Sequence, residues 1–393
     1  MCGAPLMPLS QTLLLRIFPP EQRGGAMGVW AMTTLLAPAV GPILGGIISD
    51  NWSWHWIFII NVPIVAICVM TAASMLRPVE TKTRKQPIDL VGLGLLIFWI
   101  GCLQIMLDIG RDHDWFNDPL IMALAIMGGI GFVVFLIWEL TEDNPIVDLR
   151  IFRHTGFSAG VFTLTLCFGA YFASIVVIPQ WLQISLGYTA TWAGIATAMT
   201  AMAALTTSGL AAKLMGKSDP RLLISLSVAW LGIIALARSV TWSTDADFWT
   251  LALPQFIQGF GIPFFMVPLT AVTLSAVRPD ETASAAGLQN FMRTVAVAIA
   301  TSLVLTLWGN SERVSHNDLA ATIHPDATLR QLESMGLSTD AARGLIGSLV
   351  DQQAMALAVN HVFVISAIVL FIAAALVWIS PRPKPNVDTS AAH

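Results

Sequence analysis

Charged side chains are scarce in this chain: only 11% of its 393 residues are Asp, Glu, Lys or Arg, whereas 55% are apolar. A soluble domain carries about 25% charged residues, which it needs to cover its water-facing surface. The composition therefore excludes a water-soluble globular protein. The net charge of −4 also comes without a basic patch of the kind that binds nucleic acid, so we expect no nucleic-acid partner.

Cysteine is also sparse, and the four cysteines, Cys2, Cys68, Cys102 and Cys167, lie in apolar segments without paired spacing. Neither a disulfide framework nor a zinc site is indicated. The seven histidines are scattered, and we find no nucleophile–base pair and no phosphate-binding loop. A membrane enzyme would need such clusters. We therefore set that hypothesis aside and expect neither an enzyme, nor a cofactor, nor a bound metal.

What the chain does have is long uncharged stretches, each able to cross a bilayer core, which needs about 20 helical residues. Run 155–212 is too long for one span, and the polar cluster around Gly187 predicts a turn that divides it into two helices. The pattern predicts an all-α polytopic membrane protein with ten complete spans, preceded by a partial one before residue 16. The runs are 24–49, 51–76, 90–107, 119–138, 155–212, 222–237, 248–277, 282–308 and 352–381.

Basic residues indicate the orientation, because cytoplasmic loops retain Lys and Arg. With alternate loops assigned to the cytoplasm, fourteen of the 20 basic residues lie on that side, and Arg293 lies inside a span. This distribution predicts a multi-pass membrane protein with a cytoplasmic C-terminus; the family resemblance described below implies the bacterial inner membrane. The five basic residues assigned to the opposite loops are Arg111, Arg238, Arg313, Arg330 and Arg343.

Glycine and proline gather at 41–46, GPILGG, where a spanning helix should be continuous. Gly41 and Gly45 are four residues apart and share a helix face, and together with Gly46 they allow another backbone to approach closely. Pro42 removes a backbone hydrogen bond and tends to bend the helix. We therefore expect a bent helix that packs tightly on a neighbouring helix, in a sealed or hinging contact.

This stretch and the following 54–64, WHWIFIINVPI, resemble the antiporter motif and next helix of the major facilitator superfamily, in its 14-span drug:proton antiporter branch of the EmrB and QacA type. The resemblance covers nearly the whole chain from residue 3. One departure is Ala37, where family members often carry glycine. Further matching segments are 5–15 (PLMPLSQTLLL), 104–108 (QIMLD), 143–149 (DNPIVDL), 188–194 (YTATWAG), 254–259 (PQFIQG) and 290–294 (NFMRT).

The resemblance implies a major facilitator fold lacking about its first three and a half helices, including the one whose aspartate is associated with proton coupling. It also implies a division along the chain. The expected parts are 1–76, the remnant of an N-terminal helix bundle; 77–89, a cytoplasmic linker; 90–140, two extra helices between the bundles; 141–156, a cytoplasmic loop; 157–380, a six-helix C-terminal bundle; and 381–393, a cytoplasmic tail. Segment 309–352 is amphipathic, and we expect it to form a helical periplasmic extension.

Ionisable groups within the predicted spans are few. All 24 acidic residues lie in loops or at span ends, with Asp50, Asp108 and Glu139 closest to the membrane, and Arg293 is the one deep charge. An intramembrane charge indicates a functional site. Asn290 shares a helix face with Arg293, and Gln255 and Gln258 group on the preceding span. We interpret these four residues as candidates for a substrate cavity, with bonding between helices as the alternative for the glutamines.

Two functional hypotheses remain open. The first is a multidrug efflux transporter that exports hydrophobic compounds in exchange for protons, represented here by an incomplete chain. Its implied partners are a periplasmic adaptor protein and an outer-membrane channel. Segment 309–352 is the part of the chain where we expect contact with the adaptor, with a solvated cap as the alternative. The second is a non-transporting remnant that acts as a binding or assembly partner. Because no carboxylate lies at mid-span, we predict that these 393 residues alone do not couple protons to transport.

Overall fold

The computed structural model describes residues 10, 13, 17, 18, 33, 40–76, 89–143, 145–215, 218–278, 281–322, 325–335 and 338–379. Nine helical segments within these ranges are long and apolar enough to cross a membrane. They correspond to nine of the ten predicted spans. The tenth, 24–49, falls mostly outside the described residues, as do the partial first span, nearly all of the predicted linker and the C-terminal tail.

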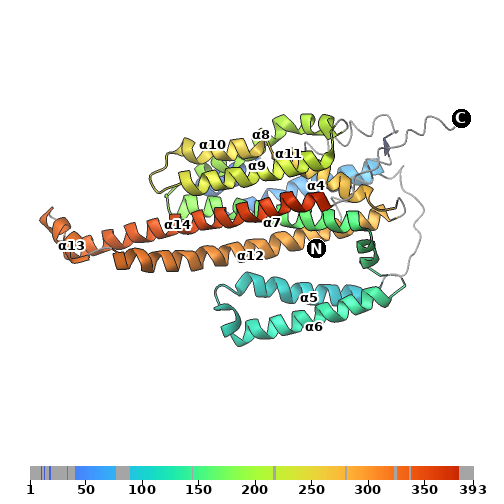
Figure 1. Cartoon of the computed structure of the whole chain (residues 1–393), viewed down its shortest axis with the longest axis horizontal. Helices are drawn as coiled ribbons and strands as arrows, with labels where there is room; N and C mark the ends of the chain where they lie inside the picture. Colours follow the sequence, from blue (N-terminus) through green and yellow to red (C-terminus); the bar gives the residue numbers. More distant parts are fainter. Residues whose placement is uncertain are drawn as a thin grey trace.

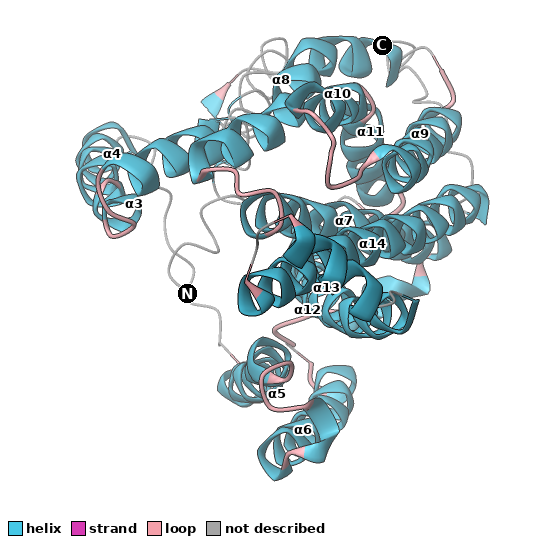
Figure 2. Ribbon diagram, turned by 90° about the vertical axis from the view of Figure 1, so that its left-hand side faces the viewer, coloured by secondary structure: helices cyan, strands magenta, loops and turns pink. Residues whose placement is uncertain are grey.

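Residues 40–51 are helical and lead into the short helix α3 (Trp56–Ile59) and α4 (Asn61–Leu76). An antiparallel hairpin follows, formed by α5 (Leu90–Ile109) and α6 (Pro119–Thr141), with the 3-10 turn η2 (Trp115–Asn117) between them. Figures 1 and 2 both show this hairpin beside the main helix bundle, not within it. A second 3-10 turn, η3 (Leu149–Arg153), connects the hairpin to the bundle.

The bundle contains six membrane-length segments that pack on one another. Its helices pair along their lengths, above all α9 with α14, α12 with α7 and α14, and α8 with α10. The division of the chain that the sequence implies stays a prediction. The helices are α7 (Thr155–Ile184), α8 (Ala190–Met215), α9 (Pro220–Thr241), α10 (Phe248–Gly259), α11 (Ile262–Ser275), α12 (Thr282–Thr322) and α14 (Thr339–Leu376), which ends in the turn η4 (Val377–Ile379).

Local sequence explains where several of these helices begin and end. The carboxylates of Asp118 and Asp219 cap α6 and α9, and each is followed by proline in the first helical turn. Both features favour a helix start, because the cap satisfies a free N–H and proline has none to satisfy. Gly187 has a φ of +66° between α7 and α8, a conformation that glycine adopts readily. The turn predicted within 155–212 is therefore present.

One predicted span is broken. The run 248–277 forms two helices, α10 and α11, which are separated at Phe260 and Gly261. The freed carbonyl of Phe260 accepts a hydrogen bond from the Thr207 hydroxyl at 3.3 Å. Backbone interrupted at membrane depth needs such a partner from a neighbouring helix. The span predicted for 248–277 is present, because α10 and α11 together make one crossing. The break between them was not predicted.

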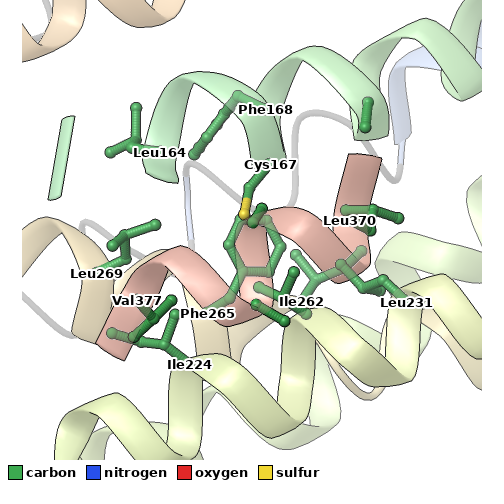
Figure 3. Packing of buried hydrophobic residues seen from close by; sticks show 14 of the residues in the cluster. Leu164, Cys167, Phe168, Ile224, Leu231, Ile262, Phe265, Leu269, Leu370 and Val377 are labelled. Carbon is green, nitrogen blue, oxygen red and sulfur yellow. The ribbon is translucent and has the colours of Figure 1, made fainter. Parts of the chain in front are cut away.

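The core of the bundle is apolar and tightly interdigitated (Figure 3). Phe265 of α11, Val228 of α9 and Cys167 of α7 are completely buried in one cluster, which Leu370 of α14 also joins. Interiors of this density hold side chains in single rotamers and keep the helix positions fixed. The packed core therefore fixes the positions of the helices that carry the polar residues described below.

The segment after α12 is helical, as expected. Helix α12 has 41 residues and α14 has 38, and α13 (Pro325–Ser334) lies between them. At 1.5 Å per residue α12 is about 60 Å long, roughly twice the thickness of a bilayer core. Figure 1 shows α12 and α14 running together beyond the other helices, with α13 at the tip. We refer to residues 309–352 of this region as the projecting hairpin.

Candidate functional site

The glycine-rich helix 40–51 meets the first turn of α8 at very short range. A Cβ atom added to Gly46 would lie 2.6 Å from the Ala190 carbonyl oxygen, and one added to Gly194 would lie 2.3 Å from that of Pro42. Each glycine therefore faces the other helix's backbone, where no larger residue fits without displacing a helix. This pair of contacts defines a seam between helix 40–51 and α8.

The sequence predicted such a contact but did not identify which glycines form it. Gly46 is buried at the seam, whereas a Cβ on Gly41 or Gly45 would meet nothing within 4 Å among the described residues. Pro42 and Gly46 are four residues apart and lie on the face towards α8. In the sequence, Gly194 is the last residue of the matching segment 188–194, and no local pattern indicates that it packs against the glycine-rich stretch 41–46.

Asp50 adds an electrostatic element to the seam. Its carboxylate accepts hydrogen bonds from the backbone N–H of Thr191 at 2.8 Å and of Ala190 at 3.3 Å. These are free donors in the first turn of α8, where the helix dipole also favours a negative charge. The Thr191 side chain and then its N–H hold the pKa of Asp50 below its usual range. One helix thus caps the next across the seam.

A second polar site lies inside the bundle, centred on Arg238 of α9. Its side chain is 1% exposed, and Nη2 donates to Gln255 Oε1 at 2.7 Å, to the Pro254 carbonyl at 3.3 Å and to Gln258 Oε1. The guanidinium also lies 5.4 Å from the ring centroid of Trp242. Within the described part of the chain, Arg238 forms no ion pair with a carboxylate.

This location corrects the sequence analysis in two respects. Arg238 was assigned to an outward loop, but α9 continues to Thr241 and carries it inside the bundle. Arg293 is therefore not the only charge within the described helices that lies away from solvent. Glu139 is also buried, at the end of α6 where the sequence placed it. Gln255 and Gln258 are 2% and 5% exposed and bond to Arg238. This arrangement supports their alternative role in bonding between helices, and their contact with a substrate stays a prediction.

Arg293 and Asn290 lie together on α12, as their spacing predicted. The Arg293 guanidinium donates to Asn290 Oδ1 and lies 5.2 Å from the ring centroid of Phe168 on α7. Phe168 in turn stacks on Phe172 at 5.7 Å. Arg293 is half-buried and pairs with no carboxylate among the residues described. A cation on an aromatic surface, without a fixed counter-charge, can receive an anionic or strongly polarised group from a ligand.

The end of the bundle that carries the η3 turn has its own ion cluster, which the sequence analysis did not identify. Glu281, just before α12, pairs with Arg153, with His154 at 2.9 Å and with Arg278 at 3.4 Å. Arg153 and His154 lie at the end of η3, so the cluster fixes the segment that precedes α7 against the start of α12. The interactions with these three partners outweigh burial and lower the pKa of Glu281, although burial alone would raise it.

These features define a multi-pass α-helical membrane protein whose helix 40–51 packs at backbone distance on α8. The general family model "Major Facilitator Superfamily" matches residues 1–301. The chain is 41% identical over 386 residues to "Multidrug export protein EmrB" of Escherichia coli K12, a match that covers 97% of this chain and 75% of that protein. The chain belongs to the Major Facilitator Superfamily, and within it to the EmrB-like multidrug exporters.

Other relatives agree with this placement. The chain is 39% identical to "Probable multidrug resistance protein EmrY" of Escherichia coli K12 and 38% identical to "Fatty acid resistance protein FarB" of Neisseria gonorrhoeae, with 97% of the chain covered in both cases. Among solved structures, a bacterial homologue of the human lysosomal transporter Spinster, in an inward-facing and occupied conformation, matches with a TM-score of 0.52. That match has 14% identity, covers 95% of this chain and 73% of the other, and supports the fold alone.

The predicted family and the all-α multi-pass fold are thus confirmed. The relative EmrB is a multidrug export protein, and the family consists of membrane transporters.

Proposed function

We propose that this protein exports hydrophobic compounds across the bacterial inner membrane in exchange for protons, with its C-terminus in the cytoplasm. The observation that carries the proposal is the seam, where Gly46 and Gly194 bring helix 40–51 and α8 to backbone distance. A contact of this kind between the two halves of a transporter can close one side of the membrane pathway and reopen when the halves rock apart.

The position of the seam favours a pathway that is closed on the outer side. Asp50, near the end of helix 40–51, bonds to the first turn of α8. Helix α8 begins where α7 ends, at the end of the bundle from which α12 and α14 extend into the projecting hairpin. The loop-charge distribution assigns that end to the periplasm. With the seam closed there, a compound would enter from the cytoplasm or the inner leaflet and would leave after the seam opens.

Arg293 supports a preference among hydrophobic compounds. Its half-buried cation lies over Phe168 with no fixed carboxylate among the described residues, so it would attract weakly acidic compounds and repel cations. The relative named as a fatty acid resistance protein is consistent with this preference, because fatty acids combine a carboxylate with an apolar chain. We propose neutral and weakly acidic hydrophobic molecules as the substrate class.

Proton exchange and assembly are the remaining parts of the proposal. Within the described spans the carboxylate that is completely buried is Glu139, near the end of α6. The prediction that this chain alone does not couple protons therefore stays open.

The projecting hairpin is the region that we expect to contact a periplasmic adaptor, which would lead to an outer-membrane channel. The intact mass of the native membrane protein tests whether the working transporter is longer than 393 residues.

The substrate preference can be tested in liposomes under an imposed pH gradient, with the native-length transporter that the intact mass defines. We expect Arg293→Ala to reduce export of a weakly acidic dye about tenfold or more, since a desolvated charge contact is worth roughly 2 kcal/mol. Arg293→Lys should retain part of the preference, and export of a neutral dye should change less. The matched control is Arg313→Ala, an exposed arginine on the same helix. Equal losses for both dyes would contradict the assignment of Arg293 to substrate recognition.

The alternative is a remnant that binds an intact transporter without transporting. It predicts no export by the purified protein under any gradient, together with co-purification of a longer relative. Export by the purified protein would exclude this alternative and would also contradict the prediction that 393 residues cannot couple protons.

A further inference from the structure

A narrow apolar groove separates the α5/α6 hairpin from α12. Its volume is about 560 Å³, and its walls come from α5, α6, α12 and the segment before α7. All lining side chains are apolar or aromatic. Representative residues are Leu103 of α5, Gly129 and Phe132 of α6, and Phe291, Met292 and Val295 of α12.

The groove is long and thin, and it runs along the helices. On α6 its lining extends from Leu124 to Leu136, and on α12 from Leu288 to Ile299. At 1.5 Å per residue both stretches are about 17 Å long. Half of a bilayer's hydrocarbon core is about 15 Å thick, so the helix-lined part of the groove is about as long as one acyl chain. Phe116 of η2 and Val147 before η3 line its opposite ends, so the groove lies across the middle of the spanning helices.

Two contacts connect the hairpin to α12 and bound the groove. The Ser302 hydroxyl of α12 donates to the Leu107 carbonyl of α5 at 2.8 Å, and the rings of Trp99 and Phe291 meet edge to face at 6.3 Å. Residues 147, 149 and 152 close the end near η3. The hairpin is therefore fixed beside the bundle at defined points while the space between them remains unfilled by protein.

The chemistry of the walls decides what fills this space. A water molecule needs two to four polar partners, which an apolar wall does not offer, and an empty cavity forfeits dispersion contacts along its whole lining. The groove lies within membrane-spanning helices, beside surface residues such as Ile130 that are exposed to lipid. We propose that the groove binds one acyl chain of a bilayer phospholipid, which attaches the α5/α6 hairpin to the bundle. This proposal is independent of the transport proposal.

Gly129 offers a direct way to fill the groove from inside. A Cβ atom there would meet nothing within 4 Å, so Gly129→Leu extends into the groove without a clash at the attachment point. Gly94→Leu is the matched control, because Gly94 is an exposed glycine on α5 whose Cβ is also free and which does not line the groove. A second filling variant, Val295→Phe, acts from the opposite wall on α12.

The experiment is native mass spectrometry of the full chain after reconstitution in nanodiscs of phosphatidylglycerol and phosphatidylethanolamine and release in mild detergent. We expect wild type and Gly94→Leu to retain one phospholipid per chain. Both filling variants should retain it about tenfold less, as expected from the lost burial of a few methylene groups. Thermal melting of each variant checks that the fold is intact.

Two outcomes would overturn the proposal. One is equal lipid retention in all four proteins. The other is a retained molecule that is not a phospholipid, such as a hydrophobic export substrate that displaces the lipid completely. A second measurement uses phospholipids brominated along the acyl chain, which quench nearby tryptophan. Comparison of wild type with Trp99→Phe isolates Trp99, and its signal should be quenched in wild type but not in the Gly129→Leu background.

Discussion

The bundle around α7 and the α5/α6 hairpin both consist of apolar, membrane-length helices but are built differently. Helix α7 buries residues around most of its circumference, including small ones such as Gly160, Gly169 and Ala173. Helix α6 buries a single stripe, spaced by three or four residues, and exposes its remaining Ile, Val and Phe side chains to lipid. In a bilayer, apolar composition alone does not separate interior from surface, whereas small and polar residues mark the interior.

The two regions also differ in the hydrogen-bond partners that they provide to a buried charge. In the bundle, Arg238 is surrounded by the amide oxygens of Gln255 and Gln258 and by a backbone carbonyl. In the hairpin, Glu139 accepts one hydrogen bond, from the N–H of Val147 at 3.1 Å, and its other oxygen has no partner among the described residues. The bundle therefore surrounds its buried charge with hydrogen-bond acceptors, whereas the hairpin leaves one oxygen of its buried carboxylate without a partner among the described residues.

The largest expected loss of stability in the bundle follows from removing the amide oxygens that bond to Arg238. We expect the double variant Gln255→Leu with Gln258→Leu to lower the free energy of unfolding by about 3 kcal/mol, because it leaves a buried charge without compensation. Chemical denaturation in detergent micelles measures the change. Gln183→Leu is the control, since this exposed glutamine bonds only to its own helix. An equal effect of the control would show that Arg238 needs no such partners.

The seam should be nearly as sensitive. Gly46→Ala places a methyl group against the backbone of α8, where overpacking costs about 1–3 kcal/mol. The closed seam should become about ten- to a hundredfold less populated. Spin labels at 51 and 192, both exposed positions, report the distance across the seam. Gly45→Ala is the matched control, because its Cβ meets nothing within 4 Å. Identical distance distributions for the two variants would contradict the assigned contact.

A smaller effect of opposite sign is expected in the hairpin. Glu139 lies close to the Asp89 carboxylate at Gly92, and neither pairs with a cation in the part of the chain described. Glu139→Gln keeps an acceptor for the Val147 N–H and removes a buried charge, so the midpoint of thermal unfolding should rise slightly. A clear decrease would mean that the carboxylate has a partner outside the described residues.

The smallest expected effect concerns pH at the seam. Because the pKa of Asp50 is lowered when it caps α8, its contribution to the closed seam is fully present above its ordinary pKa of about 3.9 and is lost as pH falls through the lowered value. The distance between labels at 51 and 192 should therefore be constant from pH 8 to pH 5 and should broaden only in stronger acid. Asp50→Asn should remove this acid response. A transition near pH 6 would indicate a different titrating group.

Sequence patterns predicted the spans, the turn at Gly187 and the helical character of the projecting hairpin, because length, hydropathy and turn residues are local properties. They misplaced Arg238, since an apolar run ends at the first charge whereas the helix itself does not. The role of Arg238 depends on glutamines from another helix, and no local pattern encodes that contact. For the same reason, the sequence could not show that the seam is formed by Gly46 and Gly194 and not by Gly41 and Gly45.

The continuity of α12 and α14 has a mechanical consequence. Each helix passes from the bundle into the projecting hairpin without a break in its described residues, so the hairpin has no joint at the membrane surface. It acts as a rigid lever arm with 14 residues of α12 (309–322) and 14 of α14 (339–352). A tilt of the bundle by about 10° would move α13 by roughly 4 Å at 1.5 Å of rise per residue. A partner bound at α13 would therefore be displaced whenever the transmembrane helices tilt.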